Sequence, residues 1–205
     1  MTRMTYDQPI MIHTPPKTDL WCQPPNTDID SAPTHLISNP IDIHKLHSAR
    51  VTFSAKLNTL YDQGDLVVFI PGEDTTTWIK TGIEFLRGKP SVMSVVTRQW
   101  SDAAMMPLGE EKDGKLTIQV ERQVKEGEKL DSLLVYIVDE ADRGKEEIRP
   151  ITWCFTDQKI SKETSDNRCL LIKVYAARLT VPGEGREQEE LVVKLEIFEV
   201  RFFDN

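Results

Sequence analysis

Residues 78–85 read Trp78-Ile79-Lys80-Thr81-Gly82-Ile83-Glu84-Phe85. Apolar and polar side chains alternate along this stretch, and a period of two is typical of a β-strand with one buried face. Ile79, Thr81, Ile83 and Phe85 share the face that we expect to point into the core. The opposite face presents an aromatic ring, a cation, a gap and a carboxylate: Trp78, Lys80, Gly82 and Glu84.

Similar short segments follow one another from residue 50 to the end of the chain, with turn residues between them. We predict strands at 51–57, 66–70, 78–85, 92–97, 116–121, 133–138, 151–155, 170–176 and 191–203. No segment has the apolar spacing of a convincing helix. Strands at this spacing predict an all-β fold, which we expect to be a two-sheet antiparallel β-sandwich.

The first 40 residues contain seven of the 12 prolines of the chain. Proline fixes φ and removes a hydrogen-bond donor, so we predict coil here, with the first dozen residues loose. Leu20 and Trp21 lie in the middle of this segment, and a tryptophan in such a segment usually packs on a domain. We therefore predict a proline-rich arm at 1–45 that packs on a single β-sandwich domain at 46–205.

Composition limits the partners and the compartment. The chain has 205 residues, with 25 Lys+Arg against 33 Asp+Glu and a formal net charge of −8. This acidity argues against nucleic acid and anionic membranes as main partners. The longest apolar run, 133–138, is too short to span a bilayer, and residues 1–20 lack the apolar region of a signal peptide. Three cysteines without a CxxC motif favour a reduced, cytoplasmic protein.

The polar face of 78–85 is the candidate ligand site. Aromatic rings stack on sugar faces, while carboxylates, amides and ammonium groups bind hydroxyls, and Lys80 suits a phosphate as a point charge. A glycine inside a strand, here Gly82, often marks the close approach of a ligand or another chain. In the alternative interpretation, Lys80 and Glu84 pair with neighbouring strands and bind nothing small. The candidate ligand-binding residues are Gln63, Trp78, Lys80, Glu84, Trp100, Ser101 and Asp102.

Catalysis has weaker support in the sequence. Glycosidases use two carboxylates about 5–10 Å apart, and only Glu84, with Asp102 as a distant second, is a candidate. No ExDxxE pattern places two carboxylates on one strand face. His35, His44 and His47 lack a typical zinc spacing. We therefore expect no catalytic residue, no metal and no cofactor.

Six segments carry a family resemblance: Tyr61-Asp62-Gln63-Gly64-Asp65-Leu66, Trp78 to Phe85, Ser94-Val95-Val96-Thr97, Ser101-Asp102, Thr18-Asp19-Leu20-Trp21 and Lys173 to Arg178. They resemble the fungal regulation-of-enolase proteins and the uncharacterised domain family around them. This resemblance implies a jelly roll of the concanavalin A-like lectin/glucanase type. It also implies a cytoplasmic protein connected with the control of enolase and sugar metabolism, without established catalytic activity.

Three functional hypotheses follow. The first is a non-catalytic regulatory or interaction protein that acts through a β-sandwich surface, with enolase as its partner. The second is a lectin-like module that binds a small sugar or a sugar phosphate. The third and most remote is a glycoside hydrolase.

Overall fold

The computed structural model describes residues 2–6, 8–71, 76–108, 114–139, 144–155 and 169–204. Every regular element in these residues is a strand, so the predicted all-β fold is confirmed, and no helix in them is long and apolar enough to cross a membrane. The strands are β1 (Thr2–Tyr6), β2 (Ile10–Thr14), β3 (Leu20–Gln23), β4 (Thr27–Asp30), β5 (Thr34–Leu36), β6 (Ile41–Asp42), β7 (Leu46–Ala55), β8 (Asp62–Pro71), β9 (Thr76–Leu86), β10 (Lys89–Thr97), β11 (Ser101–Pro107), β12 (Lys115–Lys125), β13 (Glu128–Val138), β14 (Lys145–Ile151), β15 (Cys169–Arg178) and β16 (Leu191–Phe202).

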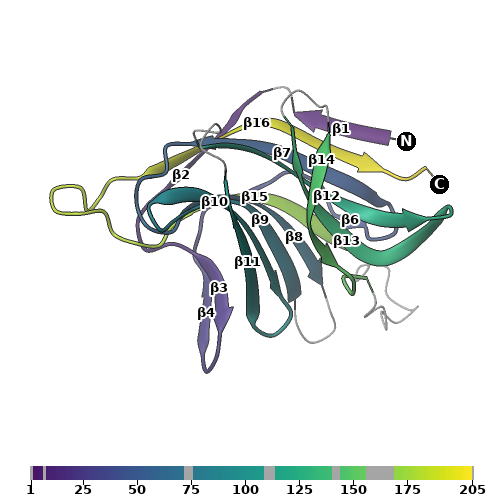
Figure 1. The fold of residues 1–205 in the computed structure, drawn as a ribbon, viewed down its shortest axis with the longest axis horizontal. Helices are drawn as coiled ribbons and strands as arrows, with labels where there is room; N and C mark the ends of the chain where they lie inside the picture. The colour runs from purple at the N-terminus through teal and green to yellow at the C-terminus, as the bar shows by residue number, and fades with distance from the viewer. Residues whose placement is uncertain are drawn as a thin grey trace.

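Two antiparallel sheets form the predicted sandwich (Figure 1). One sheet, here the β7 sheet, has the order β1-β16-β7-β12-β13-β14, and β2 also pairs with β16. The other, the β9 sheet, has the order β11-β10-β9-β8-β15-β5, and β6 also pairs with β15. Strands β3 and β4 form a separate hairpin that projects from the body.

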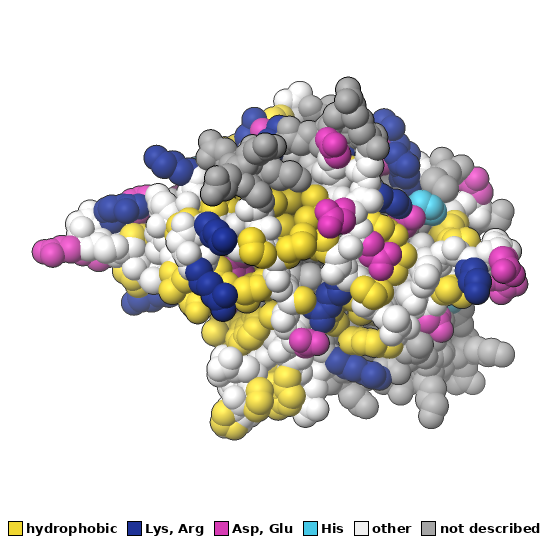
Figure 2. All heavy atoms as spheres, viewed as in Figure 1, with side chains coloured by type: hydrophobic (Ala, Val, Ile, Leu, Met, Phe, Trp, Pro, Cys, Tyr) yellow, Lys and Arg dark blue, Asp and Glu magenta, His cyan; other side chains and the backbone are white. Residues whose placement is uncertain are grey.

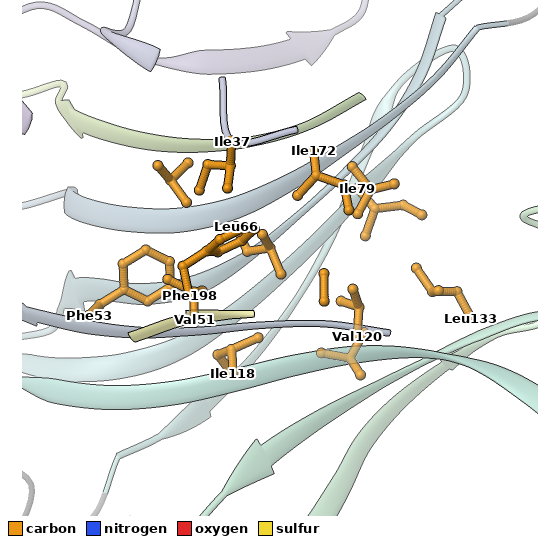
Figure 3. Close-up of a cluster of buried hydrophobic side chains, with 14 of the residues drawn as sticks. Ile37, Val51, Phe53, Leu66, Ile79, Ile118, Val120, Leu133, Ile172 and Phe198 are labelled. Carbon is orange, nitrogen blue, oxygen red and sulfur yellow. The ribbon is translucent and has the colours of Figure 1, made fainter. Parts of the chain in front are cut away.

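The core lies between the two sheets (Figure 3). Val51 and Phe53 of β7 face Leu66 of β8 and Ile79 of β9, and all four are fully buried. Burial of one such side chain contributes about 1.5–3 kcal/mol. On β9 the core face is the one that alternation predicts, because Ile79 and Ile83 belong to this cluster. The opposite face of the β9 sheet is therefore left for the polar residues.

The prediction of coil for the N-terminal segment is wrong. β1 pairs with β16 from Thr2↔Phe202 to Tyr6↔Phe198, and β2 pairs with β16 from Ile10↔Leu195 to Thr14↔Leu191. The physical reason is the position of the prolines, which all lie between strands and so remove no ladder donor. Strands on both sides of residue 45 thus belong to the same two sheets. These prolines are Pro9, Pro15, Pro16, Pro24, Pro25, Pro33 and Pro40.

The strand predicted at 151–155 is also wrong. β14 ends at Ile151, and residues 152–155 form turns whose Cys154 and Phe155 are buried. The apolar run reflects burial of a turn rather than a strand. The edge strands β11 and β14 were not predicted, because most of their residues are exposed and they lack clear alternation.

One fully buried ion pair connects β8 to β15. Arg178 donates from Nε to Asp62 Oδ1 at 2.8 Å and from Nη2 to Asp62 Oδ2 at 2.9 Å. Arg178 also donates to the carbonyl oxygen of Glu189 at 2.9 Å. The guanidinium therefore holds the start of β8 and the loop before β16 against the end of β15.

We expect Asp62→Ala to lower the free energy of unfolding by about 3–5 kcal/mol, because it leaves a buried guanidinium without its carboxylate. Urea denaturation measures this loss. The control is Asp102→Ala, since the Asp102 side chain is 80% exposed beside Arg149 and such a pair contributes about 1 kcal/mol or less. Equal losses in the two variants would contradict the assignment.

Candidate functional site

A cleft of about 780 Å³ lies on the face of the β9 sheet that points away from the core. One wall is the β3–β4 hairpin, and Figure 2 shows hydrophobic side chains gathered where Figure 1 places this hairpin. The other walls come from the segment before β8, the β9–β10 turn and the strands β10 and β11. The aromatic and apolar wall residues are Trp21, Ile29, Leu60, Tyr61, Leu86, Met93, Ala103, Met105 and Leu179.

The floor of the cleft is set by the register of β8 and β9. Gln63 lies opposite Glu84, and Asp65 lies opposite Gly82. On the far side of β8, Tyr175 of β15 lies opposite Asp65. Because these positions share one face, the polar residues of three adjacent strands meet there.

Lys80 is buried in this floor, with 2% of its side chain exposed. Its Nζ donates to the carbonyl oxygen of Leu20 at 2.9 Å, to Gln63 Oε1 at 2.9 Å and to Asp19 Oδ1 at 3.3 Å. An ammonium group has three donors, so these three acceptors occupy all of them. Lys80 is therefore committed to contacts within the protein.

Asp19 holds the N-terminal segment across the sheet. Its Oδ1 also accepts hydrogen bonds from the backbone N–H of Leu20 at 2.7 Å, from Tyr175 Oη at 3.0 Å and from Gln63 Nε2 at 3.2 Å. The donors come from the segment itself, β15 and β8, in addition to Lys80 of β9. Sequence reasoning missed Asp19 and Tyr175, although a buried lysine requires a partner of opposite charge.

Glu84 lines the cleft, and its carboxylate accepts no hydrogen bond from the described residues. The residue is nevertheless only 5% exposed. Burial raises the pKa of Glu84 to about 7, with Lys80 acting in the opposite direction and Asp19 in the same direction. The group is therefore close to half-ionised at neutral pH.

Asp65 lies deeper than Glu84, and its carboxyl is a second one whose pKa is raised. Both of its oxygens are buried and have no hydrogen-bond partner in the described part of the chain. Burial raises the pKa of Asp65 well above its usual range, although Lys80 opposes the change. Asp65 therefore keeps its proton far more firmly than an exposed aspartate, which limits the negative charge beneath the cleft.

The gap at Gly82 is filled by strand β8. A Cβ on Gly82 would lie 2.0 Å from the carbonyl oxygen of Gly64 and 2.7 Å from Asp65 Oδ1. Real Cβ atoms do not approach other atoms so closely. The close approach that the glycine predicted is therefore made by the neighbouring strand of this chain, and it lets the Asp65 side chain fold over β9.

The structure brings together three of the predicted site residues, Gln63, Lys80 and Glu84, which all line the cleft. Trp78 is on the same face but is buried in a small cluster with Leu20, away from the cleft lining. Ser101 is also on this face, and its Oγ accepts the backbone N–H of Cys22 at 3.0 Å. It positions the hairpin at this point.

Trp100 and Asp102 do not join the cleft. They line a smaller pocket beside Arg149, where Asp102 Oδ2 accepts a hydrogen bond from Arg149 Nη2 at 3.2 Å. Trp21 is the tryptophan that does line the cleft, with Lys80 Nζ 5.9 Å from its ring centroid. The N-terminal segment thus covers the Lys80 end of the polar face and leaves the Glu84 end open to the cleft.

We expect Gly82→Ala to lower the free energy of unfolding by about 3 kcal/mol or to prevent folding, because β8 and β9 must separate to admit the methyl group. Chemical denaturation measures the loss. Gly144→Ala is the control, since nothing lies within 4 Å of its Cβ position, and its effect should stay within about 0.5 kcal/mol. A loss for Gly82→Ala no larger than that for Gly144→Ala would refute the close approach of β8.

The raised pKa of Glu84 predicts a pH-dependent stability difference between the wild type and Glu84→Gln. Between pH 4.5 and about 7 the folded carboxyl holds a proton that the unfolded one has lost, so its stabilising contribution declines as pH rises through this range. At pH 8 the glutamine variant should be more stable than the wild type by about 3 kcal/mol, with little advantage below pH 4.5. Urea titrations across this range measure the difference, and a difference independent of pH would contradict the raised pKa.

Comparison with known proteins gives a family match. Residues 2–128 match the family described as "Protein of unknown function (DUF1349)". A protein of Emericella nidulans, described as uncharacterized protein AN7484, is 36% identical over 173 residues, which cover 84% of this chain and 78% of that protein. Neither description mentions enolase, so the link to enolase stays a prediction.

Solved structures are similar in fold. A functionally unknown protein from Saccharomyces cerevisiae has a TM-score of 0.67 at 19% identity, covering 98% of this chain and 97% of its own. The catalytic domain of an endo-1,3-β-glucanase (laminarinase) from Thermotoga petrophila has a TM-score of 0.52 at 13% identity, covering 84% and 68%. A GH43 protein from Bacillus licheniformis has a TM-score of 0.54 at 12% identity, covering 77% of this chain and 28% of its own. The predicted concanavalin A-like lectin/glucanase fold is confirmed.

Proposed function

We propose that this chain, which belongs to the DUF1349 family of proteins of unknown function, binds a small carbohydrate in the cleft without transforming it. The observation that supports this proposal most directly is the combination of apolar walls with a buried carboxylate at the floor, Glu84, which accepts no hydrogen bond from the described residues. Ligand sites typically have mostly apolar linings and a few polar groups that fix orientation. A cleft of about 780 Å³ is within the usual range for such sites.

The aromatic groups of the cleft suit a sugar ring. Trp21 and Tyr61 both line it, and neither is fully buried. Apolar ring faces of sugars pack on such side chains, while the hydroxyl groups need acceptors. Glu84 provides an acceptor that the described residues of the protein leave unused. We therefore assign the stacking role to Trp21 and Tyr61, and the hydroxyl-binding role to Glu84.

Binding is favoured over hydrolysis because glycosidases require a second carboxylate, and among the described cleft residues the only other one is Asp19. Asp65 does not line the cleft, and its oxygens are buried. Asp19 does line it, but its Oδ1 already accepts hydrogen bonds from four donors. The likeness to a glucanase domain concerns the fold alone, so the ligand class is argued from the cleft.

A tryptophan-fluorescence titration with mono-, di- and trisaccharides tests this proposal. The chain has four tryptophans, and Trp21 is the one that lines the cleft, so a bound sugar should produce a saturable change in emission. Trp21→Phe should remove this change, while Trp100→Phe should retain it, because Trp100 lies outside the cleft.

Glu84→Ala should weaken sugar binding about tenfold or more, because a hydrogen bond to a charged group contributes about 1.5–3 kcal/mol. Isothermal calorimetry with the best sugar of the panel measures this loss. No binding of any sugar, by fluorescence and calorimetry together, would refute the proposed function. Unchanged affinity in Glu84→Ala would refute the role of this residue.

A further inference from the structure

The polar groups on the floor of the cleft differ in what they offer a ligand. Lys80 uses its three donors on Leu20, Gln63 and Asp19. Gln63 uses its carbonyl oxygen on Lys80 and its amide nitrogen on Asp19 at 3.2 Å. Lys80 thus has its three donors in use, and Gln63 uses both its acceptor and its donor group within the protein. Lys80, the cation that the sequence offers as a phosphate ligand, therefore has no donor left for a phosphate.

Glu84 is the exception, because it is a buried carboxylate in the cleft lining with no hydrogen bond from the described residues. A group that complements it must donate hydrogen bonds, and a positively charged donor also compensates the charge. An anionic group beside it would meet both Glu84 and the nearby Asp19. The floor of the cleft is therefore complementary to a cation and not to a phosphate.

We propose that the ligand is an amino sugar whose ammonium group binds Glu84 while its ring packs on Trp21 and Tyr61. This inference rests on the proposed function, because it specifies the charge of the carbohydrate that the cleft takes. Of the two ligands in the lectin-like hypothesis, a small sugar or a sugar phosphate, it keeps the sugar and gives it a positive charge in place of the phosphate.

The charges around Glu84 set the pH range of this selectivity. Lys80 faces Glu84 from its own strand, Asp65 faces it from β8 and Asp19 from the N-terminal segment. Tyr175 of β15 completes the floor, and Arg87 lines the cleft at the β9–β10 turn. Glu84 changes its charge near neutral pH, because burial raises its pKa to about 7, and burial also raises the pKa of Asp65. A bound ammonium lowers the pKa of Glu84, so binding releases a proton near neutral pH.

Three probes with one ring test the proposal: methyl glucoside, its 6-amino-6-deoxy derivative and its 6-phosphate. At pH 8 the amine should bind about tenfold more tightly than the neutral glucoside, and the phosphate should bind most weakly. The advantage of the amine should shrink at pH 6, where Glu84 gains its proton. Calorimetry in buffers of different ionisation enthalpy should show proton release with the amine.

The control variants separate a local contact from bulk charge. Glu84→Gln should remove the preference for the amine, whereas Glu146→Gln, an equal charge change at an exposed position of β14, should retain it. If the phosphate binds best, with Arg87 as its ligand, the inference is overturned while the proposed carbohydrate function stands. Equal affinity for all three probes overturns the inference in the same way. If none of the probes and no sugar of the panel binds, the proposed function itself fails.

Discussion

The buried ammonium of Lys80 is the constraint on which the arrangement of the cleft depends. A charged group taken out of water requires a partner of opposite charge and hydrogen bonds for its remaining donors. Strand β9 cannot supply that partner, since Glu84 is about 13 Å further along it. The partner is Asp19, 61 residues earlier in the chain, which also binds Tyr175 and Gln63. The N-terminal segment is thereby held across the β9 sheet, and the β3–β4 hairpin that follows it becomes a wall of the cleft.

The same network leaves the Glu84 carboxylate open to the cleft. Lys80, Asp19, Gln63 and Tyr175 satisfy one another, and Gly82 admits the Asp65 side chain between the strands. Each of these groups is oriented by the others, so the floor is preorganised. Glu84 lies at the end of this arrangement, where the N-terminal segment no longer covers the sheet. A carboxylate that is buried, unpartnered within the described chain and in contact with the cleft is the feature that a ligand must match.

Much of the fold was predictable because alternation reports which face of a strand is buried. It assigned Ile79 and Ile83 to the core and Lys80 and Glu84 to the opposite face. The number of prolines in the first 40 residues predicts coil, but each of these prolines lies between two short strands and so interrupts none of them. The edge strands β11 and β14 were not predicted because most of their side chains are exposed, and only Met106 and Ile148 pack against the main core, which leaves no clear alternation. Asp102 points away from the face that Ser101 shares with the cleft, since neighbours along a strand point to opposite faces. Trp100 precedes β11 and lines the same small pocket as Asp102. The contact between Asp19 and Lys80 joins distant segments, and no local pattern encodes it.

The measurement that tests this account most directly is an NMR titration of the Glu84 carboxyl carbon, with its resonance assigned by its absence in Glu84→Gln. The midpoint should lie at a pH of about 7, because burial without a hydrogen-bond donor disfavours the carboxylate. A midpoint near the ordinary glutamate value of about 4.3 would contradict it. Such a value would mean that Glu84 is solvated or already paired, and that the cleft offers no open acceptor.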